Sequence, residues 1–301
     1  MNLFAKLLAR HEAGNPIRIG LIGAGKFGTM FLAHALKIPA FHIVAIADLS
    51  PFAARANLAL IGWQEEAYSA VSLDVAYAQQ TSFVTDDPSS LIADERIEII
   101  IEATGDPLAA VDHIISALDA EKHVINVTVE ADAFCGLALA RHAEKSGQIY
   151  SMAYGDQPAL VCDLVDWART CGFSVMAAGR GHKWMPHYRF STPETIWDHW
   201  GLSRQQAERG RLNPKMFNAF LDGSKPAIES AAIANGCGLH VPERGLSFPS
   251  GSIDDIPQLM RPKESGGILD APKMVEVVSS LTPDGEPIAY DIRKGVWVCI
   301  E

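Results

Sequence analysis

The sequence has no apolar run long enough to cross a bilayer, no internal repeat and no segment of biased composition. It is also short of basic residues: 25 Lys and Arg stand against 36 Asp and Glu, which gives a formal net charge of −11. A surface for nucleic acid or for an anionic membrane needs clustered positive charge. We therefore expect neither as a partner, and any anionic ligand must meet local cations.

Cysteine is scarce as well. The five cysteines form no Cys-x-x-Cys pair and no spacing typical of metal ligands. Scattered thiols in odd number are typical of a reducing compartment, where disulfides do not persist. The sequence therefore predicts free thiols that serve as small core residues in a cytoplasmic protein.

A glycine-rich turn between two apolar runs is the strongest signal that the sequence does contain. The run at 17–22 leads into Gly23-x-Gly25-x-x-Gly28 and a helical segment, and the next run, 41–47, ends at Asp48. This strand–turn–helix–strand order is that of the dinucleotide-binding fingerprint, in which the helix start receives the pyrophosphate and the acid accepts from a ribose hydroxyl. The alternative is a glycine-rich turn in an ordinary βαβ unit.

Further strand ends are expected beside that turn. Predicted strands at 97–101, 123–127 and 149–151 alternate with helices near 27–37, 51–60, 65–79, 107–119 and 132–145, which favours a parallel sheet covered on both faces. Ligands bind at the carboxyl ends of such strands. The predicted cofactor-binding residues are Gly23, Gly25, Lys26, Phe27, Gly28, Asp48, Ala103, Thr104, Gly105, Gly155 and Pro158.

The second half of the chain has a mixed pattern. Helices are expected near 157–171, 193–200, 203–209, 214–221 and 225–236, with strands at 173–178, 287–292 and 296–300. We therefore predict an α/β protein with a doubly wound Rossmann domain over 1–155 and a mixed α+β domain for substrate and dimerisation over 156–301. Gly155-Asp156-Gln157-Pro158 either borders the nicotinamide or forms a plain turn and helix start.

Two polar clusters of the second half are candidates for substrate chemistry. Arg180, His182, Lys183 and Arg189 could bind a phosphate or carboxylate, although a surface loop of solvated charges has the same composition. In the other cluster, lysine beside carboxylates could act as a general acid or polarise a carbonyl, or could form a surface ion pair. Its residues are Asn213, Lys215, Asp222, Lys225 and Glu229.

Two weaker features complete the candidates. Glu130 and Asp132 follow a predicted strand and could hold Mg²⁺ or Mn²⁺, or cap the next helix. The amphipathic start of the chain predicts a helix that docks on its own fold or on a partner subunit. The remaining isolated histidines, expected to be structural, are His113, His123, His142 and His199.

Several longer motifs resemble one known group of enzymes. Asn-Val-Thr-Val-Glu-Ala-Asp at 126–132, Ala-Tyr-Gly-Asp-Gln-Pro at 153–158 and Gly-His-Lys at 181–183 carry the resemblance. So do the fingerprint at 19–28, Asn-Pro-Lys-Met-Phe-Asn at 213–218 and Phe-Leu-Asp-Gly-Ser-Lys at 220–225. Together they resemble the homoserine-dehydrogenase-like oxidoreductases, and most closely their deoxyxylulose-phosphate-reductoisomerase-like branch. The resemblance implies a homodimer and a further C-terminal domain of the SAF type, which this sequence lacks.

The same resemblance implies NADPH-dependent conversion of 1-deoxy-D-xylulose 5-phosphate to 2-C-methyl-D-erythritol 4-phosphate. Asp222 and Lys225 match the acid–lysine pair of homoserine dehydrogenases with a spacing one residue shorter. The stretch after 123–127 is Val-Thr-Val-Glu and lacks their lysine, which argues against homoserine. Because Asp48 should repel a 2′-phosphate, unless Arg55 compensates, the cofactor is expected to be NADPH or NADH.

The function predicted from the sequence is thus an NAD(P)H-dependent oxidoreductase of a small anionic hydroxy-carbonyl compound. Two alternatives remain open. One is a dehydrogenase of another sugar acid or amino-acid precursor, and the other is a cofactor-binding protein without catalysis.

Overall fold

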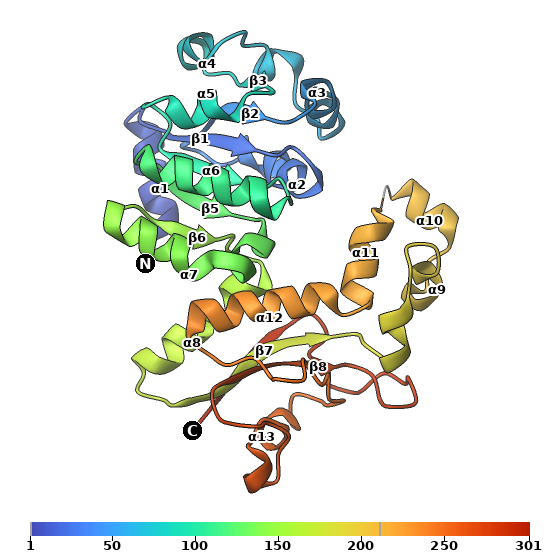
Figure 1. Ribbon diagram of the computed structural model, residues 1–301. Helices are drawn as coiled ribbons and strands as arrows, with labels where there is room; N and C mark the ends of the chain where they lie inside the picture. Colours follow the sequence, from blue (N-terminus) through green and yellow to red (C-terminus); the bar gives the residue numbers. More distant parts are fainter. Residues whose placement is uncertain (1, 211) are drawn as a thin grey trace. The chain divides into compact units, whose positions relative to one another are not determined.

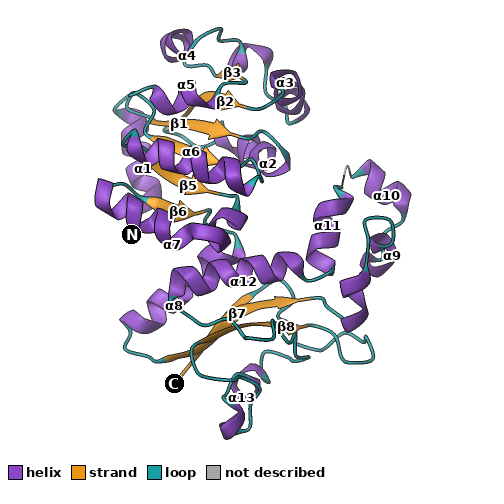
Figure 2. Cartoon of the chain, in the orientation of Figure 1, coloured by secondary structure: helices purple, strands orange, loops and turns teal. Residues whose placement is uncertain are grey.

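The computed structural model describes residues 2–210 and 212–301, and the chain divides into two compact units between Ala153 and Tyr154. This division falls two residues before the boundary expected from the sequence. Each unit has a sheet of its own (Figures 1 and 2). Among the described residues, no helix is both long and apolar enough to cross a membrane.

The first unit is built on a six-stranded parallel sheet in the order β3-β2-β1-β4-β5-β6. This is the strand order of the doubly wound Rossmann fold, whose ligand crevice opens where the order reverses, beside β1 and β4. The predicted fold class is therefore confirmed. The strands are β1 (Ile17–Ile22), β2 (Phe41–Ala47), β3 (Phe83–Thr85), β4 (Ile99–Glu102), β5 (His123–Asn126) and β6 (Tyr150–Met152).

Apolar side chains on both faces of the sheet bind it to two layers of helices. One core joins the sheet to α4 (Leu73–Gln79), α5 (Pro88–Ala93), α6 (Pro107–Asp119) and α7 (Val129–Ser146). The other joins it to α2 (Lys26–Ala35) and α3 (Pro51–Leu60). Burial on both faces explains why these strands have continuous apolar sequences without alternation.

Helix α1 (Leu3–Glu12) forms as expected, and Arg10 near its end donates to the Glu98 carboxylate at 2.9 Å. The prediction of one helix over 65–79 is wrong, because the chain forms a short 3₁₀ helix, η1 (Glu65–Tyr68), before α4. Ser72 caps α4 through its hydroxyl, which accepts from the Val75 amide, and so starts a new helix.

The second unit has a three-stranded sheet in the order β8-β7-β9 (Figure 2). Strand β7 (Val175–His182) runs parallel to β8 (Met274–Ser279) and antiparallel to β9 (Val296–Ile300). Helices α8 (Gln157–Thr170) and α12 (Ser224–Cys237) cover one face, and α13 (Ile256–Leu259) packs on the other. The remaining short helices are η2 (Pro186–Phe190), α9 (Ile196–Trp200), α10 (Arg204–Arg209), α11 (Pro214–Leu221) and η3 (Lys263–Ser265).

The expected strand pair of 287–292 with 296–300 is wrong. Tyr290 has a positive φ of 56°, which interrupts an extended strand, and β9 pairs with β7 instead. Strand β8, the other neighbour of β7, was not expected, because Glu276 interrupts its apolar run. Glu276 is buried and accepts from the Ser247 and Phe248 amides, so its carboxylate is satisfied inside the fold. The five cysteines are free thiols, as predicted, but Cys171 is exposed and is therefore not a core residue.

Candidate functional site

The glycine-rich turn of the first unit has the geometry that a dinucleotide requires. Gly23 has a φ of 98°, and a Cβ there would overlap the Ala103 carbonyl, so no other residue fits without strain. A Cβ on Gly28 would overlap the Gly23 carbonyl. Around Gly25, by contrast, a Cβ would meet no atom within 4 Å, and no side chain caps the start of α2. The first amides of α2 are therefore open to a phosphate.

A cavity of about 320 Å³ lies beside this turn, at the carboxyl ends of the strands. Of the predicted cofactor residues, Gly23, Gly25, Asp48, Ala103 and Thr104 line it. Lys26 and Phe27 are exposed on the first turn of α2. The cavity residues that sequence reasoning did not single out for the cofactor include Asp86, Asp106 and His113.

Asp48 is held at the end of β2 by the turn itself. One carboxylate oxygen accepts from the Ala24 amide at 2.9 Å, and the other accepts from the Ser50 amide at 2.9 Å. The nearby Arg55 donates to the Tyr68 carbonyl at 2.8 Å and lies over the Tyr68 ring. The cation that could have compensated Asp48 toward a 2′-phosphate is thus engaged elsewhere, and acids line the cavity.

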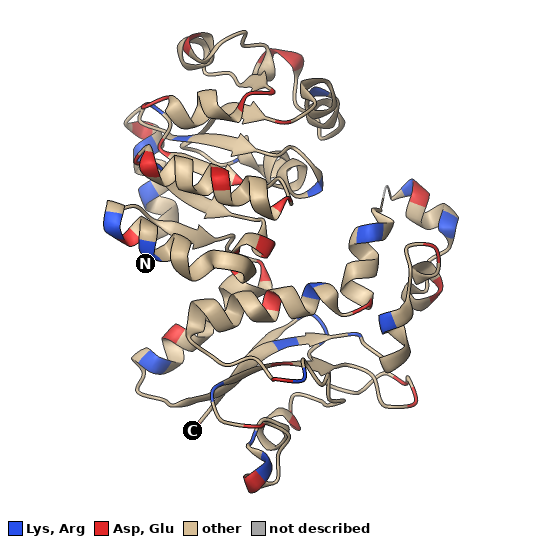
Figure 3. Ribbon diagram, in the orientation of Figure 1, with Lys and Arg blue, Asp and Glu red and all other residues tan. Residues whose placement is uncertain are grey.

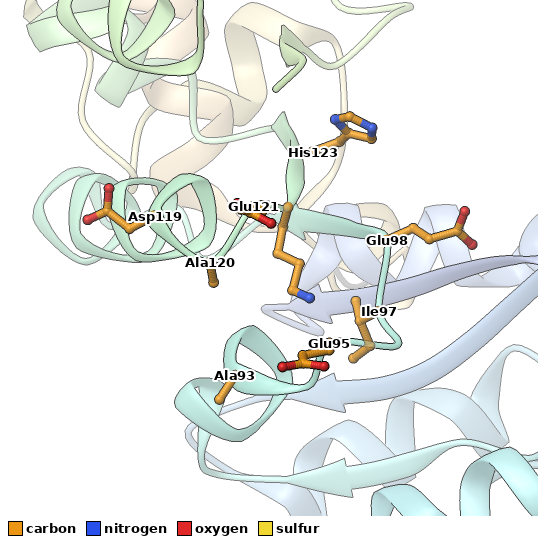
Figure 4. Close-up of a pocket in the computed structure, with 9 residues that line it drawn as sticks. Ala93, Glu95, Ile97, Glu98, Asp119, Ala120, Glu121 and His123 are labelled. Atoms are coloured by element: carbon orange, nitrogen blue, oxygen red, sulfur yellow. The ribbon is translucent and has the colours of Figure 1, made fainter. Parts of the chain in front are cut away.

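A second hollow in this unit lies at the opposite, amino ends of β4 and β5 and has a volume of about 700 Å³ (Figure 4). The carboxylates of Glu98, Asp119 and Glu121 point in different directions there (Figure 4). Lys122 donates to the Asp94 carbonyl at 2.8 Å. Because ligands of parallel sheets bind at carboxyl ends, we do not assign this hollow to the cofactor.

The metal site that was one of two interpretations of Glu130 and Asp132 is not supported by the described residues. Asp132 is buried and accepts from the Asn126 amide group at 2.8 Å and from the Tyr150 hydroxyl at 2.6 Å. Burial and the Asp132 carboxylate raise the pKa of Tyr150 above its usual range, so this hydroxyl stays a donor. In the described parts of the chain, no group of three or more His, Cys, Asp or Glu side chains could hold a metal ion. Neither Mg²⁺ nor Mn²⁺ is therefore assigned to Glu130 and Asp132.

In the second unit, the segment after residue 178 was expected to be a loop, but the strand continues to His182. A Cβ on Gly179 would overlap the Glu276 carbonyl, and one on Gly181 would overlap the Ile292 carbonyl. The close approach that these glycines permit is therefore to neighbouring backbone of the same fold.

Arg180 and Glu229 correct two predictions of the site. Arg180 lies on β7 and forms a hydrogen-bonded ion pair with Glu229 of α12, with both side chains buried. Neither side chain is available to a substrate in this arrangement. The expectation that Arg180 binds substrate and Glu229 is catalytic is therefore wrong, because each neutralises the other inside the unit.

The position of His182 also argues against a role in substrate binding. Its ring is buried, and Nε2 lies 2.6 Å from the Phe220 carbonyl, to which it donates. Burial and the nearby Arg180 guanidinium lower the pKa of His182 to about 4, so the ring is neutral near pH 7. Arg189 is exposed and lies over the Trp184 ring, with 5.4 Å between its guanidinium carbon and the ring centroid.

Two further predicted residues serve the helices that carry them. Asn213 caps α11: its side-chain oxygen accepts from the Lys215 amide at 3.0 Å. Asp222 accepts from the Ser224 amide at 2.8 Å and from the Asn218 side chain at 2.9 Å, which shapes the turn between α11 and α12. Gly155 has a φ of 110°, and Asp156 caps α8 with Pro158 in its first turn, so the segment is the turn and helix start that was one of its two interpretations.

Among the predicted site residues of the second unit, Lys183 has the position that is most compatible with a functional role. It follows β7, is half-buried, and its Nζ donates to the His199 carbonyl at 2.6 Å. Burial and the nearby Arg293 lower the pKa of Lys183. Arg293, which sequence reasoning missed, donates to the Ser280 hydroxyl at 3.0 Å, just beyond β8. No sequence signal could find it, because only the antiparallel pairing of β7 with β9, in which Arg180 lies opposite Val296, brings residues 183 and 293 together.

The two predicted clusters of the second unit are neighbours in space. His182 contacts Phe220, and the Trp184 Nε1 atom lies 3.3 Å from where a Cβ on Gly223 would be. Lys225, half-buried, is the second residue of α12, two residues after Gly223. Along α11 and α12, Figure 3 shows the Lys and Arg positions separated from one another, with Asp and Glu positions among them. An anion bound here would therefore meet few cations.

Comparison with known proteins assigns both units to oxidoreductases. Residues 155–301 match the family model described as the catalytic domain of oxidoreductase DRL. Residues 17–130 match the model of an oxidoreductase family with an NAD-binding Rossmann fold. The chain therefore carries the domains of an NAD(P)-dependent oxidoreductase, and its first unit is the NAD-binding one. No curated protein sequence matches the chain.

Several solved structures are similar to parts of the chain. A homoserine dehydrogenase from Thiobacillus denitrificans is 17% identical, with a TM-score of 0.50 over 75% of this chain and 50% of that chain. The S. aureus homoserine dehydrogenase is 20% identical over 46% of this chain and 32% of that chain, with a TM-score of 0.33. The WlbA dehydrogenase of Bordetella pertussis, solved in complex with NADH and UDP-GlcNAcA, is 19% identical over 61% of this chain and 50% of that chain, with a TM-score of 0.41. The chain spans half or less of the length of each of these structures.

Proposed function

We propose that the protein is an NAD(H)-dependent oxidoreductase of a small anionic hydroxy-carbonyl compound. The observation that carries the proposal is the cavity of the first unit, where the open Gly25, the uncapped start of α2 and the Asp48 carboxylate come together. These features fit the pyrophosphate and a ribose of a dinucleotide. When bound, the nicotinamide supplies a hydride donor or acceptor.

We propose NAD(H) over NADP(H), against the cofactor that the family resemblance implies. Asp48 and Asp86 both line the cavity, and Arg55 is engaged by the Tyr68 carbonyl. A 2′-phosphate would bring negative charge to these carboxylates without a free arginine to receive it. Replacing Asp48 by Ser should lower the dissociation constant of NADPH relative to that of NADH, because one of these carboxylates is removed. A wild-type protein that binds NADPH more tightly would contradict this choice.

As substrate we propose 1-deoxy-D-xylulose 5-phosphate, with 2-C-methyl-D-erythritol 4-phosphate as product. The sequence motifs that resemble the reductoisomerase-like branch support this choice, together with two neighbouring cations, Lys183 and Arg293, of which Arg293 also lies 3.6 Å from the Asp291 carboxylate. Arginine can bind a phosphate through two parallel hydrogen bonds, and a lysine ammonium can polarise a carbonyl oxygen. We assign the polarisation of the substrate carbonyl to Lys183 and to Lys225.

The test is NADH oxidation by the purified full chain with this substrate. Turnover, with methylerythritol phosphate identified by mass spectrometry, would support the proposal. Turnover only with other sugar acids or with an amino-acid precursor would replace the substrate and keep the class of enzyme. Tight binding of NADH without turnover across that panel would favour the cofactor-binding protein without catalysis. Absence of NADH and NAD⁺ binding would contradict the proposal as a whole.

We also propose a homodimer, as the family resemblance implies. Leu3 and Phe4 on α1 are more than half exposed, which leaves apolar surface available for a second copy. Light scattering of the purified chain measures its mass directly. A mass of one chain, 32.5 kDa, across the micromolar range would contradict the dimer.

A further inference from the structure

Four buried polar residues lie at the carboxyl ends of β4 and β5 or shortly after them: Glu102, Asn126, Thr128 and Asp132. Such residues are costly in the interior unless each polar atom has a partner. Glu102 is the most deeply buried of them, with no exposed surface. Its hydrogen bonds therefore indicate what the fold gains from a carboxylate at this place.

Glu102 connects two loops. Its Oε1 accepts from the Thr104 hydroxyl at 2.5 Å and from the Thr104 amide at 3.2 Å, in the loop between β4 and α6. Its Oε2 accepts from the hydroxyl of Thr128, in the loop between β5 and α7. The Thr128 hydroxyl in turn accepts from the Gly105 amide at 3.0 Å. One carboxylate thus holds residues 104 and 105 from both sides.

The loop that Glu102 holds lies directly against the glycine-rich turn. The Ala103 amide donates to the Ile22 carbonyl at 2.8 Å. A Cβ on Gly23 would lie within 2.8 Å of the Thr104 amide nitrogen. Because no space separates these backbones, a shift of residues 103–105 must displace the turn that ends at Gly25.

Glu102 itself does not line the cavity, whereas Thr104 and His113 do. The Nδ1 atom of His113 is buried, and it lies 3.6 Å from the nearer carboxylate oxygen of Glu102, beyond hydrogen-bond distance. The Glu102 carboxylate thus lies behind the residues that line the cavity, and it acts on the cavity through those residues. An apolar side chain could fill this space, but it could not accept from Thr104 and Thr128 together.

We propose that Glu102 is a positioning residue for the cofactor: it ties the β4–α6 and β5–α7 loops together and so sets the glycine-rich turn in the form that receives NAD(H). This inference rests on the proposed function, because it assigns a role toward the same cofactor. It goes beyond the fingerprint, which contains neither Glu102 nor Thr128.

The test measures NADH binding to the full chain by fluorescence, without any substrate. Glu102→Gln and Thr128→Val should each raise the dissociation constant of NADH at least tenfold, while Thr128→Ser, which keeps the hydroxyl, stays within twofold of wild type. Asp112→Asn, at an exposed carboxylate on α6, is the matched control and should bind as wild type does. Wild-type affinity in both Glu102→Gln and Thr128→Val would overturn the inference.

A second measurement separates positioning from general loss of structure. Hydrogen exchange of the protein without cofactor should accelerate in peptides over 20–28 and 103–108 of Thr128→Val, and remain unchanged over 175–182 in the second unit. If Glu102→Gln does not fold, the comparison of Thr128→Val with Thr128→Ser carries the test alone. Exchange that is equal in the two Thr128 variants would overturn the inference. Failure of the wild type to bind NADH would overturn the proposed function, and this inference with it.

Discussion

Arg180 on β7 and Glu229 on α12 form an ion pair in which the two side chains are only 4% and 1% exposed. The pair joins the sheet of the second unit to the helix that covers it. Breaking such a pair leaves one charge buried without a partner, and the penalty for this is larger than the net gain from forming the pair.

Replacing Glu229 by Ala should therefore reduce the free energy of unfolding by about 3–5 kcal/mol. Urea denaturation followed by circular dichroism measures this change. The control is Asp270→Ala, which removes the exposed ion pair of Lys263 and should have no measurable effect. Replacement of both partners, Arg180→Met with Glu229→Leu, should recover most of the loss. If Glu229→Ala is as stable as wild type, the pair does not stabilise the unit.

Acid should destabilise the protein through His182. The pKa of His182 is lowered to about 4 in the fold, against 6.5 for an ordinary histidine, so the unfolded chain binds the proton more tightly. The contribution of the neutral His182 ring to the free energy of unfolding is therefore fully present above pH 6.5. It is lost as the pH falls toward 4, by about 3 kcal/mol in total. Burial lowers the pKa of His42 and His199 as well, and they contribute with the same sign.

Unfolding free energies at several values between pH 7 and pH 4 measure the loss. Because other histidines contribute, the comparison is between wild type and His182→Gln, which retains a donor for the Phe220 carbonyl and cannot titrate in this range. The variant should show a smaller slope over this range. An unchanged slope would mean that His182 does not titrate as its burial indicates.

Gly25 and Gly23 should separate cofactor binding from folding. Gly25 has an ordinary φ of −69° and open space where a Cβ would stand, so Gly25→Ala should leave the melting temperature unchanged. The added methyl group should still obstruct the pyrophosphate and weaken NADH binding at least tenfold. Gly23→Ala should instead destabilise the fold by about 1–3 kcal/mol, because the left-handed φ strains any other residue.

Calorimetry of unfolding and titration with NADH give the two readouts for each variant. Wild-type affinity in Gly25→Ala would show that no phosphate approaches this position. A Gly23→Ala protein as stable as wild type would show that the turn moves away from Ala103.

Lys183 should carry turnover and leave cofactor binding unchanged. Lys183→Ala should lower kcat/KM at least about 100-fold while the dissociation constant of NADH stays as in wild type, because the proposed role is toward the substrate. Lys294→Ala removes an exposed lysine close in sequence to Arg293 and is the control. Burial and Arg293 lower the pKa of Lys183, so activity that needs its charge should decline at a lower pH than for an ordinary lysine. Full activity of Lys183→Ala would contradict this role.

The first unit was predictable because its signals are local. An apolar run followed by glycine, or a proline at a helix start, specifies its element through nearby residues, and helices 51–60 and 107–119 form at the residues expected. The second unit was less predictable because its strands pair across long separations. Strand β8 follows β7 by more than 90 residues, and Glu276 in its centre is tolerated only because Ser247 and Phe248 donate to it.

The same division holds for the candidate site. The sequence by itself determined the turn at 23–28 and Asp48, because the residues of the fingerprint lie close together in the sequence and its glycines are required by the local backbone geometry. It also determined the start of the loop at 103–105, because this loop directly follows an apolar strand. Only the tertiary structure decided which charges are free. It pairs Arg180 with Glu229, uses His182, Asn213 and Asp222 within the fold, and brings Arg293 near Lys183. The physical reason is that the availability of a polar side chain depends on the partners that packing provides, and these partners lie far away in the sequence.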